Sequence, residues 1–129
     1  MKSPNSIEEV NKRINTLVIH HQSFSAALKR IEYCHRVSLT KKEPRSLMIV
    51  GVSGSGKSFL QQHYVSKFPV EANETATRIP VIAIRIPAPP VLSAVADEIL
   101  AAFGDLYRGG TIKAQKDRII MLIKQCQVE

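Results

Sequence analysis

Gly51-Val52-Ser53-Gly54-Ser55-Gly56-Lys57-Ser58 is the stretch that decides the fold of this chain. It matches the phosphate-binding pattern G-x-x-x-x-G-K-[ST] at every fixed position. Residues 46–50 before it form an apolar run that predicts a strand, and residues 57–68 after it predict a helix. Strand, glycine-rich loop and helix in this order are the context that the pattern requires. The alternative is a flexible Gly/Ser linker, and we favour a phosphate loop because chance matches are rare.

The residue types of the loop suit the binding of a polyphosphate. Glycines 51, 54 and 56 permit positive φ angles and bring backbone N–H groups close to phosphate oxygens. The helix that begins near Lys57 directs unpaired N–H groups at the same anion. Lys57 would reach the β- and γ-phosphates, and the Ser58 hydroxyl would ligate Mg²⁺. The predicted cofactor-binding residues are Gly51, Val52, Ser53, Gly54, Ser55, Gly56, Lys57, Ser58 and Phe59, with Ser58 as the metal ligand.

The composition is that of a globular protein that favours anionic partners. A length of 129 residues suggests one domain or part of one, and 44% hydrophobic residues suffice for a core. The formal charge of +7 would attract polyanions such as nucleic acids, although a basic surface kept for solubility is an equal alternative. No apolar run is long enough to span a membrane, and the polar N-terminus does not resemble a signal peptide. Cys34 and Cys126 show neither disulfide nor zinc spacing. We therefore expect a cytoplasmic protein without a membrane partner.

The hydrophobic pattern predicts an α/β fold. Helices are expected at residues 6–14, 23–35, 57–68, 91–103 and 111–128, and strands at 46–50 and 78–86. The second strand is almost continuously apolar, which is typical of a parallel strand covered on both faces. Gly104 is expected to end one helix and Thr111 to cap the next. We divide the chain into a helical lead-in at residues 1–45 and a P-loop domain at residues 46–129.

Candidate catalytic groups are not found among the residues after the loop. A P-loop hydrolase needs an acidic residue at the end of a later strand to hold Mg²⁺ and orient the attacking water. The apolar run from Val81 to Ile86 ends in Ile86-Pro87 instead. We therefore assign no catalytic residue, expect no hydrolysis by this chain alone, and expect the chain to be truncated before the strand with the Walker B acid. His20, His21, His35 and His63 lack regular metal-ligand spacing and are expected to have structural roles.

The sequence resembles the AAA+ ATPases of Tn7-like transposons, the TnsC/TniB group. The matching features are the histidine-containing connector and helix from His20-His21 to Cys34, the P-loop, and the turn Ile84-Arg85-Ile86-Pro87-Ala88-Pro89-Pro90. The helices Val91 to Phe103, followed by Gly104-Asp105, and Thr111 to Val128 complete the match. The resemblance covers nearly the whole chain but only the first half of an AAA+ module. It implies a P-loop NTPase fold of AAA+ type, with a three-layer parallel sheet.

The function implied by this resemblance is ATP-dependent regulation of DNA transposition. Such proteins use ATP and Mg²⁺, assemble as rings or filaments on duplex DNA, and connect target-selection proteins to the transposase. A full-length chain would then be an oligomeric ATPase. Phosphate contacts by Lys and Arg dominate DNA affinity, and the candidates by charge and position are Arg85, Arg108, Lys113, Lys116 and Lys124. For each of these side chains, the alternative is an exposed surface residue that does not contact DNA.

Two other functions remain open from the residues. An unrelated P-loop enzyme, such as a small-molecule kinase cut at the same place, would share the loop but need a substrate lid, which residues 75–90 do not clearly show. A non-catalytic module that binds nucleotide without turnover is the second alternative. Pro44-Arg45, just before the first predicted strand, are candidates to border a pocket for the base. The preference for ATP over GTP follows from the resemblance alone.

Overall fold

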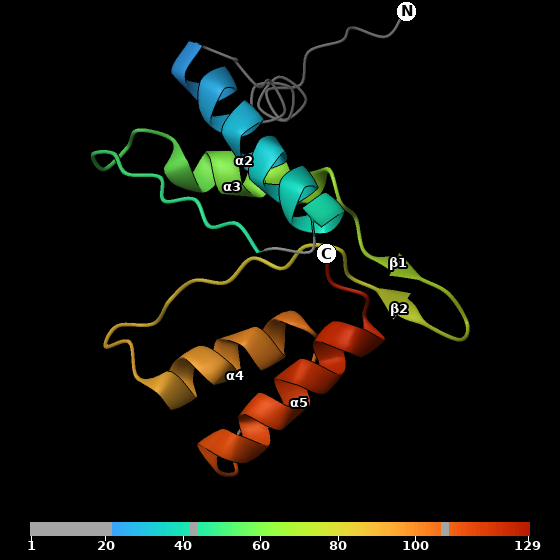
Figure 1. Ribbon diagram of the computed structural model, residues 1–129. Helices are drawn as coiled ribbons and strands as arrows, with labels where there is room; N and C mark the ends of the chain where they lie inside the picture. The colour runs from blue at the N-terminus through green and yellow to red at the C-terminus, as the bar shows by residue number, and fades with distance from the viewer. Residues whose placement is uncertain (1–21, 42–43, 107–108) are drawn as a thin grey trace, which may run out of the picture.

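The computed structural model describes residues 22–41, 44–106 and 109–129. Within them the elements are α2 (Gln22–Lys41), α3 (Lys57–Ser66), β1 (Glu71–Ala72), β2 (Thr77–Arg78), α4 (Leu92–Ala102) and α5 (Ile112–Gln125), as Figure 1 shows. The helices predicted at 23–35, 57–68, 91–103 and 111–128 are confirmed. The helix predicted at 6–14 lies outside the described residues.

Helix α2 extends six residues beyond the predicted end at His35. The residues from Arg36 to Lys41 include neither glycine nor proline, so the chain meets no helix breaker there. The hydroxyls of Ser38 and Thr40 also donate hydrogen bonds to the carbonyl oxygens four residues earlier, at 2.8 and 2.7 Å. The polar composition that indicated a connector therefore belongs to an exposed helical face.

The ends of α4 and α5 follow the predicted local chemistry. Gly104 has a φ of +82°, and its N–H donates to the carbonyl of Ala101. The N–H of Asp105 reaches back to the carbonyl of Leu100, which completes a Schellman motif. At the start of α5, the Thr111 hydroxyl accepts a hydrogen bond from the N–H of Ala114 at 3.2 Å. Both predicted helix boundaries are thus confirmed.

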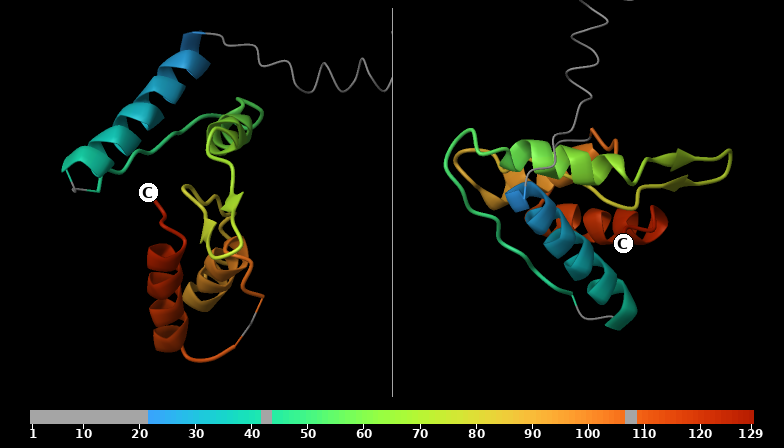
Figure 2. Two further views of the ribbon diagram at one scale, coloured as in Figure 1. Left: turned by 90° about the vertical axis from the view of Figure 1, so that its right-hand side faces the viewer. Right: turned by 90° about the horizontal axis from the view of Figure 1, so that it is seen from above.

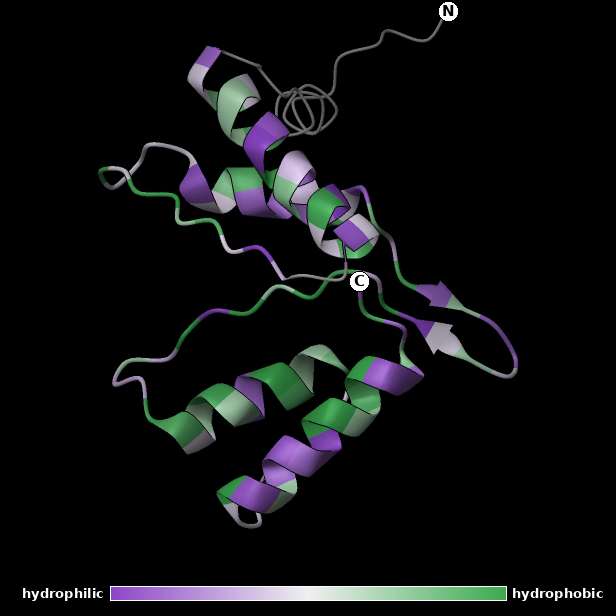
Figure 3. Cartoon of the chain, in the orientation of Figure 1, coloured by the Kyte–Doolittle hydropathy of each residue, from purple (hydrophilic) through white to green (hydrophobic). Residues whose placement is uncertain are grey.

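The described residues form three levels. Helices α2 and α3 lie on one side, α4 and α5 lie on the other, and two extended segments of the chain run between them (Figure 1). The left view of Figure 2 separates the same two helical pairs. The extended segments are residues 44–52, which lead into the P-loop, and residues 79–91, which lead into α4. They carry mostly hydrophobic residues where the predicted strands were placed (Figure 3).

The predicted parallel sheet is not formed by the described residues. Segments 46–50 and 79–86 have no strand partner, and the sheet that is present is the antiparallel hairpin of β1 and β2. A strand requires a neighbour about 4.8 Å away that accepts and donates its backbone hydrogen bonds. The two segments do not pair with each other, and the side chain of Met48 is consequently 86% exposed. The three-layer order is present without the sheet that was expected to fill its middle.

Each helical pair has its own small apolar core. Between α2 and α3, the core contains the buried side chains of Phe24, Leu28, Leu60 and Tyr64. Between α4 and α5, Leu100 is 1% exposed, and Ala96 and Cys126 are also buried. The buried Gln115 donates a hydrogen bond to Asp97 across this second pair, at 2.7 Å. The first core fixes the helix that carries the phosphate loop, and thereby positions the site.

Candidate functional site

The loop from Gly51 to Ser58 joins an extended segment to the first turn of α3. Gly54 and Gly56 have φ angles of +80° and +88°, in the left-handed region that glycine adopts without cost. Gly56 is the N-cap of α3, and no side chain caps the first turn. The first intrahelical bond runs from the Leu60 N–H to the Gly56 carbonyl at 2.9 Å. The N–H groups of the first turn are therefore available to an anion, as predicted.

Gly51 has a different task from the one predicted. Its φ lies outside the left-handed region, so no positive angle requires glycine there. A Cβ at this position would lie 2.7 Å from the Oγ of Ser55, closer than a real Cβ tolerates. The loop bends back through a hydrogen bond from the Ser55 N–H to the Val52 carbonyl at 3.2 Å. A side chain at position 51 would therefore require the Ser55 hydroxyl to move.

The Lys57 side chain lies over the loop. Its Nζ donates to the carbonyl oxygens of Gly51 and Val52 at 2.6 and 2.7 Å, and to the Ser55 Oγ at 3.2 Å. These three contacts hold a full positive charge against the backbone of the predicted phosphate cradle. An incoming polyphosphate would meet this ammonium together with the free N–H groups of α3.

Phe59 contributes to the site differently from its neighbours. Its ring packs 5.9 Å from the ring of Phe24 and lies 6.4 Å from that of His63 at an interplanar angle of 19°. Phe24 also lies 5.7 Å from His63. The side chain of Phe59 therefore belongs to the contact between α2 and α3, and what this residue can offer a phosphate is its backbone N–H.

Two clefts flank α3, and both begin at its first turn. One has a volume of about 520 Å³ and is lined by Lys57, by Arg45, and by the apolar residues Leu47 and Ile49 of the extended segment. The other, of about 730 Å³, is lined by Ser58 and Arg85 on opposite walls. Of Pro44 and Arg45, which were candidates to border a pocket for the base, Arg45 lines this cleft and Pro44 does not. The clefts themselves could not be predicted from the sequence, because they lie between segments that are distant in the chain.

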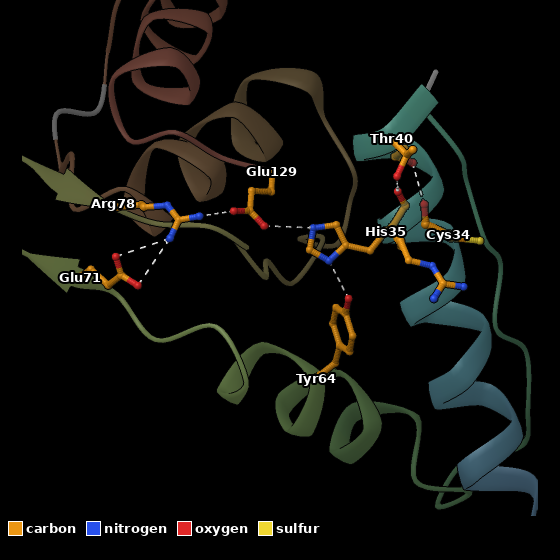
Figure 4. A network of polar contacts seen from close by, with 9 residues as sticks. Cys34, His35, Thr40, Tyr64, Glu71, Arg78 and Glu129 are labelled. Carbon is orange, nitrogen blue, oxygen red and sulfur yellow. Dashed lines mark hydrogen bonds and ion pairs between the residues drawn. The ribbon is translucent and has the colours of Figure 1, made fainter. Parts of the chain in front are cut away.

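His35, Tyr64 and Glu129, which also line the first cleft, belong to a polar network (Figure 4). The His35 Nδ1 lies 2.6 Å from the Tyr64 hydroxyl, and its Nε2 lies 3.6 Å from a carboxylate oxygen of Glu129. Glu129 is also ion-paired with Arg78, whose guanidinium lies 3.5 Å from Glu71. Burial raises the pKa of Tyr64 above 10.0, with further contributions from the charges of Glu32 and Glu129. His35 thus has the structural role expected of it.

The residues that connect this network lie far apart in the sequence. Glu129 and Arg78 are separated by 51 positions, and His35 and Tyr64 by 29. Two backbone hydrogen bonds bring the end of the described chain to this place, from the Ile79 N–H to the Cys126 carbonyl and from the Glu129 N–H to the Pro80 carbonyl, both at 2.9 Å. No periodicity or motif in the sequence marks such a pairing, so the network could not be predicted from the sequence.

The donor set fits a nucleotide phosphate well and Mg²⁺ in part. The loop supplies backbone N–H groups and the Lys57 ammonium, which match phosphate oxygens. For Mg²⁺ it supplies the exposed Ser58 hydroxyl, and the ion would take its other ligands from phosphate and water. Among the described residues that line the two clefts, Glu129 is the one carboxylate, and it is engaged by Arg78. The described residues of these two clefts therefore offer groups that can hold a phosphate, and the one carboxylate among them is ion-paired.

The predicted DNA-contacting residues fall in two places. Lys113, Lys116 and Lys124 are exposed on α5, at spacings that place them on one face of that helix. This face is opposite to the one that contains the buried Gln115 and Cys126. Arg85 is exposed but lies in the cleft beside Ser58, away from α5. Arg108 lies outside the described residues.

Comparison with known families gives one match. A family model described as "Bacterial TniB protein" matches residues 11–129. The match includes the whole of the P-loop and every described helix. Comparison with curated proteins and with solved structures gave no significant match. Within the described residues, no helix is long and apolar enough to cross a membrane.

Proposed function

The chain belongs to the TniB family, whose members are AAA+ proteins associated with Tn7-like transposition, and we propose that it is an ATP-binding, DNA-binding regulator of that process. The family confirms the resemblance seen in the sequence and supports a P-loop nucleotide-binding fold, nucleotide and Mg²⁺ use, and a role associated with transposition. The residues that bind nucleotide and DNA are proposed from the geometry of the chain, whereas its assembly and its protein partners are proposed from the family.

Nucleotide binding rests on one observation above the others. The loop places two left-handed glycines, an uncapped helix N-terminus and a lysine ammonium around the same backbone turn. Each of these three features favours the binding of a phosphate group, and all three act on the same turn of the backbone. ATP with Mg²⁺ at residues 51–59 is the ligand that we propose. The lack of a free carboxylate in the described clefts favours binding without turnover by these residues.

DNA binding rests on the lysine face of α5, which we define as Lys113, Lys116 and Lys124. These side chains point away from the packed side of the helix, where a nucleic acid backbone can approach them. Asp117 lies beside them and reduces the local charge. Three phosphate contacts of this kind give binding that is independent of sequence and sensitive to salt. In the proposed function, the DNA-bound protein assembles into a homo-oligomer and connects target-selection proteins to the transposase.

The experiment that tests this function separates the two ligands. Titration with a fluorescent ATP analogue and Mg²⁺ should show binding that is lost in Lys57→Ala, because that variant removes the ammonium from the loop. Titration with a labelled DNA duplex should show binding that weakens when the lysine face is changed to glutamine, with ATP binding unchanged. The slope of log affinity against log salt should become less steep by about three units.

The matched control removes three charges from another helix. Lys29, Arg36 and Lys41 are exposed on α2, and their replacement by glutamine changes the net charge by the same amount. If the α2 variant weakens duplex binding as much as the α5 variant does, then the lysine face has no special role. If the wild-type chain fails to bind ATP, the nucleotide site itself is refuted.

A further inference from the structure

The larger of the two clefts beside α3 runs between that helix and the extended segment 83–86. Its polar lining consists of Ser58, Gln61, Gln62 and Ser66 from α3 and Arg85 from the opposite wall. Ser58 is the residue that would face Mg²⁺ and the outer phosphates of a nucleotide held in the loop. The cleft therefore opens directly from the phosphate end of the proposed site.

The lining of this cleft carries positive charge and no negative charge. Arg85 is its charged residue, the other polar side chains are neutral hydroxyls and amides, and no carboxylate lines it. Within the described part of the chain, the Arg85 guanidinium has neither a hydrogen bond nor an ion pair, whereas Arg78 and Arg118 are both ion-paired. An arginine that faces neutral donors across an open cleft is suited to a bidentate contact with a phosphate.

We propose that this cleft accepts a phosphate group and that Arg85 binds it. The inference rests on the proposed nucleotide site, because the cleft begins at Ser58. The phosphate has two possible sources with the same chemistry, namely the outermost phosphate of a bound triphosphate or a backbone phosphate of duplex DNA. In either case Arg85 acts apart from the lysine face of α5, with which the sequence alone had grouped it.

The test measures the affinity of the full chain for three ligands, each with Mg²⁺: ATP, ADP and a labelled duplex. Arg85→Gln removes the charge, Arg85→Lys keeps the charge but removes the planar fork, and Arg30→Gln on α2 removes an exposed arginine elsewhere. If the source is the nucleotide, Arg85→Gln should weaken ATP binding about 10- to 100-fold and leave ADP binding nearly unchanged. Arg85→Lys should give an intermediate loss of ATP affinity, because Lys is a point charge without the fork.

If the source is DNA, Arg85→Gln should weaken duplex binding more than Arg30→Gln does and should leave ATP and ADP binding unchanged. Either pattern supports a phosphate in this cleft. The inference is overturned if Arg85→Gln and Arg30→Gln bind all three ligands alike while Lys57→Ala still abolishes ATP binding, since the loop would then function without the cleft. If the wild-type chain binds neither nucleotide nor duplex, both the proposed function and this inference fail.

Discussion

Replacement of Gly56 by alanine offers a quantitative test of the loop. Gly56 has a φ of +88° and a ψ of 11°, and a Cβ added there would meet no heavy atom within 4 Å. The cost of the substitution is therefore conformational and not steric. An L-residue other than glycine in the left-handed region costs about 1–2 kcal/mol.

This conformational cost must lower either the free energy of unfolding of the free protein or its affinity for ATP. If the loop keeps its shape in the free protein, the free energy of unfolding falls by about 1–2 kcal/mol and ATP affinity is unchanged. If the exposed loop relaxes, stability is preserved and ATP affinity falls about 5- to 30-fold. Because nothing packs against the position, we expect relaxation and thus the loss of affinity. In both cases the two losses sum to the same amount.

A second glycine provides the matched control. Gly104 has a φ of +82°, and a Cβ added there would also meet nothing within 4 Å, but it lies at the end of α4. Gly104→Ala should lower the free energy of unfolding by about 1–2 kcal/mol with ATP affinity unchanged. Urea unfolding, with and without ATP, and direct ATP titration give both quantities for each variant. The reasoning is refuted if the combined loss in Gly56→Ala is below about 0.5 kcal/mol, or if Gly104→Ala weakens ATP binding equally.

Two further predictions concern stability. Leu100→Ala should lower the free energy of unfolding by about 2–5 kcal/mol, because Leu100 is 1% exposed, whereas Leu106→Ala, at a position that is 77% exposed, should change it by less than about 0.5 kcal/mol. Equal urea midpoints for the two variants would contradict the core between α4 and α5. The raised pKa of Tyr64 means that the folded state holds the phenolic proton more tightly than the unfolded chain does. The contribution of Tyr64 to the free energy of unfolding is therefore fully present below the unfolded-state pKa of about 10 and is lost as the pH rises through the folded-state pKa. Unfolding measured between pH 9 and pH 12 should show this loss in the wild-type chain and a smaller one in Tyr64→Phe, and identical slopes would argue against the burial of Tyr64.

Local structure was largely predictable because its causes are local. Phe24 and Leu28 recur at helical spacing, and they are buried in α2 as the pattern indicated. Gly104 ends α4 through its backbone geometry, and Thr111 begins α5 through a side-chain cap. Both effects operate within a few residues. The error in the length of α2 has the same origin, since polar residues without a helix breaker do not end a helix.

The three-layer parallel sheet implied by the resemblance is not confirmed by the described residues. Apolar runs such as Val81 to Ile86 indicate a segment that suits a strand, but a strand forms only with a partner across the hydrogen-bonding direction. Within the described residues, the partners of the two extended segments are not present. Pairing is a property of two segments together, so the composition of either segment cannot establish it.

The sequence by itself determined the phosphate loop and the helix that follows it, because eight consecutive residues carry the chemistry and the glycines set the local backbone. It also indicated the family, through the proline-rich turn and the helices that match along nearly the whole chain. Tertiary structure decided the rest of the site. It turned the ring of Phe59 toward α2 and left Arg85 across a cleft from Ser58. These arrangements depend on packing between segments distant in the chain, where no short motif fixes which side chains meet.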